Sequence, residues 1–314
     1  MKNPVISIVG SYAVALTMMT KRFPTSGETL MGENFKQFHG GKGSNQAVES
    51  ARLGANVNFV ACIGKDGFGK GAINLYKTEG INTNYITESD NLSTGVGFII
   101  VDEQGHNIIT LDLGANLDLN PDYVNLMKDS IIVSDVLLMQ LEISTQSVVA
   151  AAKIAKENGV KVILNPAPYQ PLPDDIWEDI YILTPNEKEA KLILGYDPES
   201  EIAIQELADG IIKKGVKNVI ITLGGRGAYF ATSSYSNKYQ LIPARKVDVV
   251  DTTGAGDTFS AALGVAIGEG KALSESVQFA SAAASLSVTK YGVIEAMPYR
   301  NQVDKLMSSN LSNI

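Results

Sequence analysis

The segment 247–267 reads VDVVDTTGAGDTFSAALGVAI and joins the three patterns that decide the fold. The β-branched run Val247–Val250 predicts a buried strand. A turn follows at Asp251–Asp257, where Gly254 and Gly256 allow the backbone to bend tightly. Apolar residues then recur at helical spacing, at Phe259, Leu263 and Ile267. The segment therefore predicts a strand that turns sharply into a buried helix.

The turn Asp251-Thr252-Thr253-Gly254-Ala255-Gly256-Asp257 is the segment most specific for chemistry. Its glycine amides and the positive end of the following helix favour developing negative charge. The carboxylate of an aspartate in this turn would repel a permanently bound anion. It is suited instead to act as a base that takes a proton from a hydroxyl beside a phosphoryl group. An isolated Asp257 would more simply cap the helix. In the Gly-Ala-Gly-Asp context we favour catalysis.

The rest of the chain repeats the alternation of short apolar runs and helical segments. Further buried strands are predicted at Val5–Val9, Asn58–Ile63, Val136–Leu141, Val160–Leu164, Ile180–Leu183 and Val219–Thr222. Helical segments that end at a glycine lie at Asn45–Leu53, Lys70–Glu79 and Thr145–Asn158. Continuous apolar strands that alternate with helices indicate a mostly parallel sheet covered on both faces. The predicted fold class is therefore α/β, a three-layer α/β/α sandwich.

Two stretches interrupt this alternation. Residues 11–39 contain the turn cluster Phe23–Gly27, and residues 94–113 have the pattern of a hairpin whose turn lies at Asp102–Gly105. We expect both stretches to form a small β layer that stands off the main sheet, as a lid over a site or merely as an insertion. The α/β domain then comprises the remaining residues, 1–10, 40–93 and 114–314.

The composition limits the partners and the compartment. With 34 acidic and 26 basic residues among 314, the formal net charge is −8, which disfavours nucleic acid and anionic membranes as partners. The sequence shows neither an apolar run long enough to span a bilayer nor a signal-peptide pattern. The one cysteine, Cys62, lies in an apolar stretch, so we expect a buried thiol and a cytoplasmic protein.

The segment Gly40–Ala47, which reads GGKGSNQA, opens the first long predicted helix. Its glycines let the backbone approach a ligand, and Lys42 and Asn45 offer donors to hydroxyls or to an anion. The spacing of a nucleotide phosphate loop is absent, and a flexible turn before a helix is an equal alternative. Glu142, at the end of a predicted strand, would emerge at the same edge of the sheet.

Two segments at strand ends suit a nucleotide and its metal, because ligands bind at the strand ends of parallel sheets. Thr184–Glu189 places Asn186 and Glu189 on one face of a helical turn, where they could hold hydrated magnesium or simply cap the helix. Thr222–Gly227 is rich in glycine and suits a nucleotide phosphate or ribose, or a tight turn.

Taken together and in this order, GGKG, Asn-Pro-Ala-Pro at 165–168, Pro-Asn-Glu at 185–187 and DTTGAGD resemble the motifs of the ribokinase family, the PfkB-type carbohydrate kinases. The resemblance covers nearly the whole chain. It implies a ribokinase-like fold and transfer of the γ-phosphoryl group of ATP to a small sugar. It also implies a homodimer formed through the lid.

The resemblance implies roles for individual residues. Asp257 would be the catalytic base, with an anion hole formed by the amides of Gly254, Ala255 and Gly256. Sugar-binding positions match Gly41, Lys42, Asn45 and Glu142. The motif that organises Mg²⁺ and phosphate matches Asn186 and Glu189, and the nucleotide contacts match Thr222, Gly224 and Gly227. A K⁺ site would use Asp251 and Thr253 with the backbone of Val288, Lys290 and Gly292.

The chain departs from the family pattern after the first strand. Members of the family have Gly-Ser-x-Asn-x-Asp there, whose Asn and Asp hold sugar hydroxyls, whereas this chain has Ala13 and Ala15. Each lost partner of a buried hydroxyl costs about 1–3 kcal/mol. We therefore expect the acceptor to be a smaller, deoxygenated or differently decorated alcohol instead of ribose. Phe38 and His39 would supply replacement contacts, and a solvent-facing His39 is an equal alternative.

Two smaller departures weaken further expectations. Ser281 stands where members have Asn or His near the adenine, and Ala296 where a serine often assists the K⁺ site. Two other functions remain open: a nucleoside kinase of the same superfamily, and a non-catalytic relative that binds a sugar. A substrate panel separates the first, and the retention of Asp257 and its glycine turn argues against the second.

Overall fold

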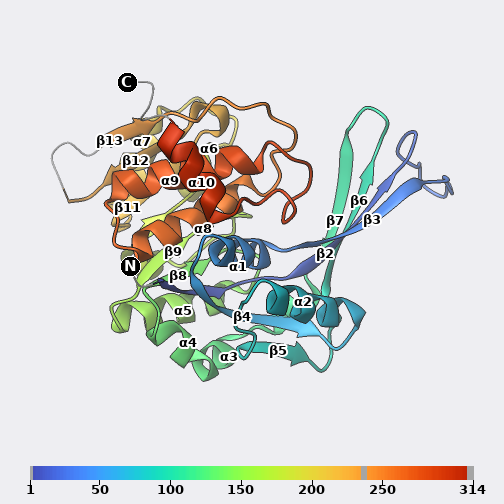
Figure 1. Cartoon of the computed structure of the whole chain (residues 1–314), viewed down its shortest axis with the longest axis horizontal. Coiled ribbons are helices and arrows are strands. Elements are labelled where there is room, and N and C mark those ends of the chain that lie inside the picture. Colours follow the sequence, from blue (N-terminus) through green and yellow to red (C-terminus); the bar gives the residue numbers. More distant parts are fainter. Residues whose placement is uncertain (1–2, 235–238, 310–314) are drawn as a thin grey trace.

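The computed structural model describes residues 3–234 and 239–309, which form a large sheet with helices on both faces and a small sheet beside it (Figure 1). The large sheet has nine strands in the order β13-β12-β11-β10-β9-β8-β1-β4-β5. These strands are β1 (Val5–Val9), β4 (Asn56–Gly64), β5 (Ile86–Ser89), β8 (Val136–Met139), β9 (Lys161–Leu164), β10 (Ile182–Leu183), β11 (Asn218–Thr222), β12 (Ala228–Thr232) and β13 (Tyr239–Ile242). All neighbouring pairs from β5 to β11 are parallel, and β12 and β13 extend the sheet by antiparallel pairing.

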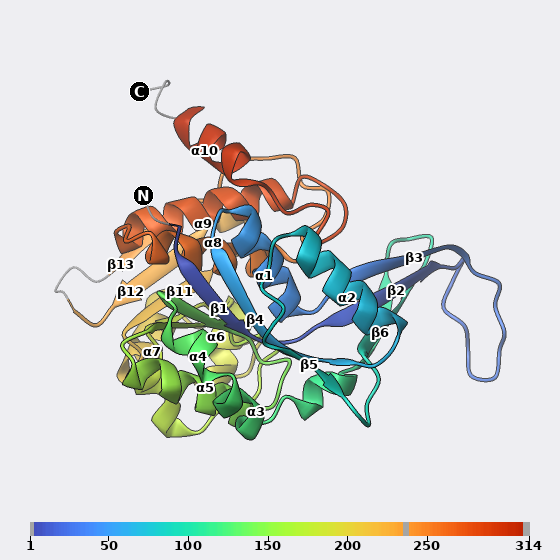
Figure 2. The ribbon, with the colours of Figure 1, turned by 60° about the horizontal axis from the view of Figure 1, so that its bottom comes forward.

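Two groups of helices cover the two faces of the large sheet (Figure 2). One face carries α1 (Lys42–Arg52), α2 (Gly67–Thr78), α8 (Ala255–Gly268), α9 (Leu273–Ser287) and α10 (Arg300–Ser309). The other carries α3 (Pro121–Leu126), α4 (Lys128–Ile132), α5 (Thr145–Glu157), α6 (Glu187–Ile193) and α7 (Ile204–Lys213). Alternate strand residues point to opposite faces, so Ile220 joins one core while Val219 and Ile221 join the other.

The glycines that were predicted to end helices do lie at the ends of helices. Gly80 follows the last turn of α2 with a φ of 72°, and Gly159 follows α5 with the same φ. Both angles lie in the left-handed region that favours glycine. Sequence patterning therefore predicts these helix ends to within one or two residues.

The prediction of a strand at Val247–Val250 is wrong. The segment has no strand partner in the described chain, and Val249 and Val250 are 62% and 60% exposed. Its backbone instead meets the end of α9, where the amide of Val250 donates to the carbonyl of Val288 at 2.8 Å. A β-branched run favours extended backbone, but a strand also needs a neighbour. The segment follows β13, the last strand of the sheet, but it packs against the end of α9 instead of pairing with the free edge of β13.

The small sheet has four strands in the order β3-β2-β6-β7 and extends away from the large sheet (Figure 1). They are β2 (Ala13–Met19), β3 (Glu33–Gly40), β6 (Gly95–Val101) and β7 (Asn107–Asp112). The expected hairpin turn closes where the amide of Gly105 donates to the carbonyl of Asp102 at 3.0 Å. The division into a kinase domain and a lid with the boundaries given above remains a prediction.

None of the helices in the described part of the chain combines the length and the hydrophobicity needed to cross a bilayer.

Candidate active site

Loops after several parallel strands meet around a cavity of about 200 Å³. Its lining includes Asn165 after β9, Thr184 after β10 and Thr222 at the end of β11. Lys42, which follows β3 of the small sheet, joins them. Gly254, Gly256 and Asp257 close it from the start of α8. The carboxyl ends of parallel strands thus converge on one polar pocket, as expected for an α/β sheet.

Asp257 lies in the first turn of α8 and is only 4% exposed. Its carboxylate accepts hydrogen bonds from Asn45 Nδ2 at 2.8 Å and from Gln46 Nε2 at 3.2 Å. Gln140 Nε2 in turn donates to Gln46 Oε1 at 2.6 Å, which fixes the orientation of that amide. The carboxylate is therefore held in place by α1 and faces the cavity.

The two glycines of the turn serve different purposes. Gly254 adopts the left-handed conformation with a φ of 78°, and an added Cβ would lie 2.5 Å from Cγ1 of Val293. Gly254 is therefore required by the fold. Among the described residues, an added Cβ on Gly256 would meet no atom within 4 Å, although Gly256 lines the cavity. The backbone at Gly256 is thus open to a ligand.

The start of α1 is tied to the end of β8 through Glu142. The carboxylate of Glu142 accepts from the amide of Lys42 at 2.8 Å and from Ser11 Oγ at 2.6 Å. Gly41 permits this approach, because its φ is 85° and an added Cβ would lie 2.7 Å from Cα of Tyr12. The negative charge of Asp257, and less strongly that of Glu142, raises the pKa of Lys42, so its ammonium is charged beside both carboxylates.

Asn186 and Glu189 form a capping box at the start of α6. Asn186 Oδ1 accepts from the amide of Glu189 and Glu189 Oε2 accepts from the amide of Asn186, both at 2.9 Å. The capping alternative is therefore present, but both residues also line the cavity. Burial raises the pKa of Glu189, against smaller opposing effects of the Asn186 amide and of Lys42.

A groove of about 550 Å³ continues from the cavity and shares Asn186, Thr222 and Gly256 with it. Its lining brings together four residues predicted to contact a nucleotide, namely Thr222, Gly224, Gly227 and Ser281. It also includes residues that the motifs did not point to, such as Arg245, Lys246, Phe259 and Ala284. A long groove that opens beside the buried carboxylate of Asp257 suits a nucleotide.

The residues predicted to bind K⁺ gather beside the glycine turn. The carboxylate of Asp251 accepts from Thr253 Oγ1 at 2.7 Å, from the amide of Thr253 at 2.9 Å and from the amide of Gly292 at 3.2 Å. The amide of Asp251 donates to the carbonyl of Val288 at 3.3 Å. Lys290 lies between Val288 and Gly292 in the chain. Although partial burial of Asp251 raises its pKa, the hydrogen bonds from Thr253 and Gly292 leave the net pKa lowered.

The structure does not bring His39 to the cavity. Its Nδ1 lies 2.7 Å from the hydroxyl of Tyr12, and it pairs with Val14, whose side chain belongs to the core. Phe38 pairs with Ala15 on the opposite face of the small sheet, where its ring contacts Tyr291 at a centroid distance of 6.3 Å. Phe38, Ala13 and Ala15 therefore share the face of the small sheet on which Phe38 contacts Tyr291.

Cys62 lies on β4 and is buried. Burial raises the pKa of its thiol to about 12, so the nucleophilic thiolate is strongly disfavoured. This environment agrees with the expectation of a structural cysteine.

Comparison with known proteins decides the family. The family model described as "pfkB family carbohydrate kinase" matches residues 3–300. The chain belongs to this family. A ribokinase of Haemophilus influenzae is 41% identical over 297 residues, which cover 95% of this chain and 96% of the relative. A ribokinase of Staphylococcus aureus is 38% identical over 308 residues, which cover 98% of this chain and all of the relative (100%).

Solved structures of ribokinases share the fold of this carbohydrate kinase. The structure of Arabidopsis thaliana ribokinase complexed with ribose and ATP superposes with a TM-score of 0.92 at 33% identity, covering 98% of this chain and 99% of the other. Ribokinase of Thermotoga maritima gives a TM-score of 0.88 at 35% identity, covering 97% and 99%. These matches confirm the predicted ribokinase-like α/β fold with its small separate sheet.

Sequence reasoning found most of the cavity but missed several polar residues that line it or hold the carboxylate of Asp257 in place. Gln46 and Gln140 were not singled out, although Gln46 lies within the quoted segment GGKGSNQA. Asn165 and Thr184 line the cavity and begin two of the quoted motifs. Their positions at strand ends were the available signal. The link from Gln140 to Gln46 depends on how α1 packs against the sheet, so the sequence carried no signal for it.

Proposed function

We propose that this kinase transfers the γ-phosphoryl group of ATP to a hydroxyl of a small sugar or sugar-like alcohol. The observation that carries the proposal is the buried carboxylate of Asp257 at the junction of a polar cavity and a long groove. The groove has the position and length for ATP, and the cavity has the size for a small acceptor. The ribokinase relatives, one solved with ribose and ATP, support this assignment.

Asp257 is the catalytic base in this proposal. Its carboxylate accepts the proton of the acceptor hydroxyl, while Asn45 and Gln46 hold it in orientation. The amides of Gly254, Ala255 and Gly256 at the start of α8 stabilise the negative charge that develops on the transferred group. The ammonium of Lys42 adds positive charge on the same side of the cavity.

The acceptor lies against the start of α1 in this proposal. Of the residues there, Lys42 lines the cavity, and its ammonium would donate to a hydroxyl. Gly41, Asn45 and Glu142 lie next to it and would complete the acceptor site, Asn45 as a donor and Glu142 as an acceptor. Thr222, Gly224 and Gly227 contact the nucleotide from the end of β11, and Ser281 contacts it from α9. His39 acts indirectly, because its contact with Tyr12 supports the strand that covers the acceptor.

Mg²⁺ fits the donor set at Asn186 and Glu189. The half-buried carboxylate of Glu189 lines the cavity with a raised pKa, so a cation there would remove an electrostatic cost. These two residues would hold the ion through its waters, as is usual for Mg²⁺ beside phosphates. Bound there, it would neutralise charge on the phosphate oxygens of ATP.

K⁺ fits the oxygen-rich loop beside the glycine turn. Asp251 supplies a carboxylate whose pKa its hydrogen bonds lower, Thr253 supplies a hydroxyl, and backbone carbonyls of Val288, Lys290 and Gly292 would complete the set. Hard oxygen ligands of this kind suit an alkali cation. Bound there, K⁺ would stabilise the backbone of the anion hole without contacting the acceptor.

The acceptor preference departs from that of the ribokinase relatives in this proposal. Ala13 and Ala15 lie with Phe38 and Gly97 on the face of the small sheet where Phe38 contacts Tyr291. These four side chains offer no hydrogen bond, so a hydroxyl directed at them would lose its partner. A deoxygenated or differently decorated alcohol therefore fits better than ribose.

Two further assignments belong to the proposal. The kinase forms a homodimer through the small sheet, which exposes Met18, Phe98 and Ile108. It works in the cytoplasm, in agreement with its buried unpaired Cys62.

The test is acceptor-dependent release of ADP from ATP, with Mg²⁺ and K⁺, across pentoses, deoxypentoses, hexoses, tetroses, polyols and nucleosides. A deoxypentose or another decorated alcohol should lead ribose in kcat/KM by about tenfold or more, because one unpaired buried hydroxyl costs about 1–3 kcal/mol. If ribose gives the highest kcat/KM, the proposed departure from ribose is wrong but the assignment as a kinase stands. A nucleoside in the lead would favour the nucleoside kinase. Sugar binding without turnover in the whole panel would favour the non-catalytic relative.

A further inference from the structure

The loop between α9 and α10, residues 288–299, lies on the side of the large domain that faces the small sheet (Figure 1). Its residue Tyr291 is 58% exposed, and the ring contacts two side chains of β3 in the small sheet. The ring centroids of Tyr291 and Phe38 lie 6.3 Å apart with an interplanar angle of 66°, and Lys36 Nζ lies 5.4 Å from the centroid of the Tyr291 ring. Both arrangements are favourable for an aromatic ring. Tyr291 therefore joins this loop to the small sheet.

The loop is anchored on both sides of Tyr291. Before it, the carbonyl of Val288 accepts a hydrogen bond from the amide of Val250 at 2.8 Å. After it, the carbonyl of Met297 accepts from Arg52 Nη1, at the end of α1, at 3.2 Å. The segment between these anchors is therefore held against the large domain, and from it the ring of Tyr291 reaches β3.

The same segment packs against the glycine turn at the start of α8. The amide of Gly292 donates to the carboxylate of Asp251 at 3.2 Å, and Cγ1 of Val293 lies 2.5 Å from the position of a Cβ added to Gly254. Gly254 lines the acceptor cavity. Because Val293 is in such close contact with Gly254, a shift of Tyr291 would reach the glycine turn through the two residues that follow it.

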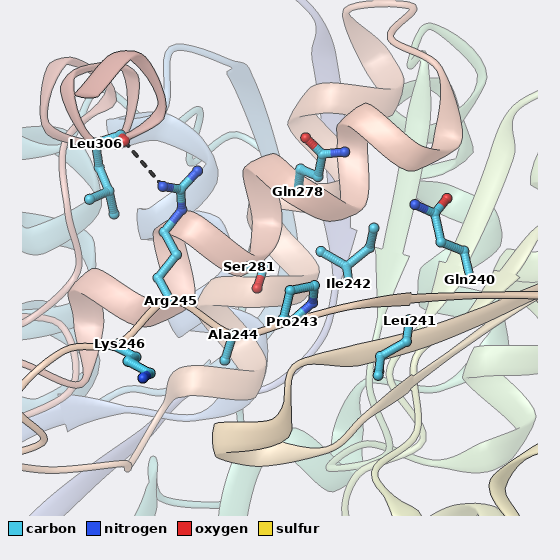
Figure 3. A pocket seen from close by; sticks show the side chains of 10 residues that line it. All are labelled: Gln240, Leu241, Ile242, Pro243, Ala244, Arg245, Lys246, Gln278, Ser281 and Leu306. Atoms are coloured by element: carbon cyan, nitrogen blue, oxygen red, sulfur yellow. Dashed lines mark hydrogen bonds between the residues drawn. The ribbon is translucent and has the colours of Figure 1, made fainter. Parts of the chain in front are cut away.

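The loop also begins at the nucleotide groove. Ser281 of α9 and Val288, the C-cap of that helix, both line this groove. Ser281 also lines a cavity of about 630 Å³ that shares residues with the groove (Figure 3), whereas Val288 meets Val250 just before the glycine turn. The loop therefore contacts the nucleotide groove at its first residue and the small sheet three residues later, with the glycine turn beside both.

We propose that Tyr291 is a positioning residue that couples binding of the acceptor to binding of the nucleotide. The inference rests on the proposed function, because it takes the cavity as the acceptor site and the groove as the nucleotide site. An acceptor that lies against the small sheet fixes β3, so Phe38 holds the ring of Tyr291 and the loop holds the glycine turn in the form that binds phosphate. Each ligand therefore raises the affinity for the other by the same factor.

Calorimetry of the full chain measures this coupling without turnover. The ligands are the Mg²⁺ complex of the β,γ-methylene analogue of ATP and the best acceptor of the panel, at a constant K⁺ concentration. We expect the acceptor to lower the dissociation constant of the analogue by about fivefold or more, a usual size for coupling between two sites. In Tyr291→Ala this factor should fall to about twofold or less, whereas Tyr291→Phe should keep it because the ring is retained.

Two further variants assign the effect to the contact with the small sheet. Phe38→Leu should also lower the factor, and its combination with Tyr291→Ala should cause no further loss, because the two rings act as a pair. Phe38→Leu leaves the loop itself intact, so it keeps the test valid if Tyr291→Ala disturbs the loop. Tyr196→Ala is the matched control and should keep the full factor, because Tyr196 is an exposed tyrosine that lines neither the acceptor cavity nor the groove.

The outcomes separate this inference from the proposed function. A parent protein that binds both ligands without coupling, full coupling in Tyr291→Ala, or an equal loss in Tyr196→Ala overturns the role of Tyr291 and leaves the assignment as a kinase intact. Failure of the parent protein to bind the analogue or any acceptor of the panel overturns the proposed function as well.

Discussion

Asp257, which packs against α1, and Glu49, which belongs to α1, both carry buried carboxylates, but the surroundings of the two groups differ. Asp257 accepts hydrogen bonds from two amides and faces the cavity. Glu49 is fully buried, and neither of its carboxylate oxygens has a hydrogen-bond partner among the described residues. Burial raises the pKa of Glu49 well above its usual value, against a smaller opposing effect of Arg52. Burial therefore favours the neutral form of Glu49 in the folded protein, whereas two side-chain amides hold the carboxylate of Asp257 in place.

Replacement of Glu49 by Gln should stabilise the protein at about pH 8 and have little effect below about pH 4, near the ordinary pKa of a glutamate. The folded state holds a proton on Glu49 that the unfolded state releases above that pKa. Stability is therefore lost as the pH rises from the unfolded pKa towards the raised folded pKa. The neutral amide removes this loss. Urea denaturation of both proteins across this range measures it.

Glu157→Gln is the matched control, because Glu157 is exposed near the end of α5. It should leave the pH dependence of unfolding unchanged. A Glu49→Gln variant whose stability follows the same pH curve as the parent protein would show that Glu49 is ionised in the folded state.

At the scale of single elements, the close packing of the first turn of a helix against neighbouring backbone positions the residues of the site. Gly43 lies in the first turn of α1, where an added Cβ would lie 2.4 Å from the amide nitrogen of Ser11 and 2.6 Å from the carbonyl carbon of Gly10. These are backbone atoms after β1, so they cannot move aside like a flexible side chain. The approach holds α1, and with it Lys42 and Asn45, against the acceptor cavity.

Gly43→Ala should destabilise the protein by about 1–3 kcal/mol, the usual cost of overpacking, and should raise the KM for the acceptor. Gly67→Ala is its counterpart at the start of α2, where an added Cβ meets no atom of the described chain within 4 Å. This control should be neutral or slightly stabilising. Thermal denaturation and acceptor kinetics of both variants check the prediction, and equal behaviour would contradict it.

Sequence patterns predicted a helix, strand or turn correctly where the residues of that segment alone determine its structure. The turn with Gly254 and Asp257 does open a buried helix, because glycine freedom and apolar spacing are local properties. The segment Val247–Val250 failed as a strand, since pairing depends on a neighbour that the sequence does not reveal. The contact of Gln46 with Asp257 was missed for the same reason, because it joins residues 211 positions apart.

At the scale of the whole molecule, the small sheet exposes apolar side chains that the large domain does not cover. Phe98 is 58% exposed and Ile108 48% exposed, and both lie on the same face of the sheet as Leu16. Such a surface is typical of a protein interface. It supports the proposal that the lid joins two copies of the chain.

Phe98→Asp should convert the proposed dimer to a monomer, because a charge would have to be buried without a partner. Sedimentation velocity of both proteins measures the change. Leu126→Asp is the control, since Leu126 is 72% exposed on α3 and lies outside the small sheet. A parent protein that sediments as a monomer, or a Phe98→Asp variant that remains a dimer, would contradict the lid contact.

The central claim, that Asp257 is the base of a sugar kinase, is tested most directly by Asp257→Asn with the best acceptor of the panel. We expect kcat to fall by about 10²–10⁴-fold, the usual contribution of general base catalysis. Binding of the acceptor, measured by calorimetry, should change by only a few-fold, because the amide keeps the shape of the side chain. Turnover close to that of the parent protein would contradict the claim.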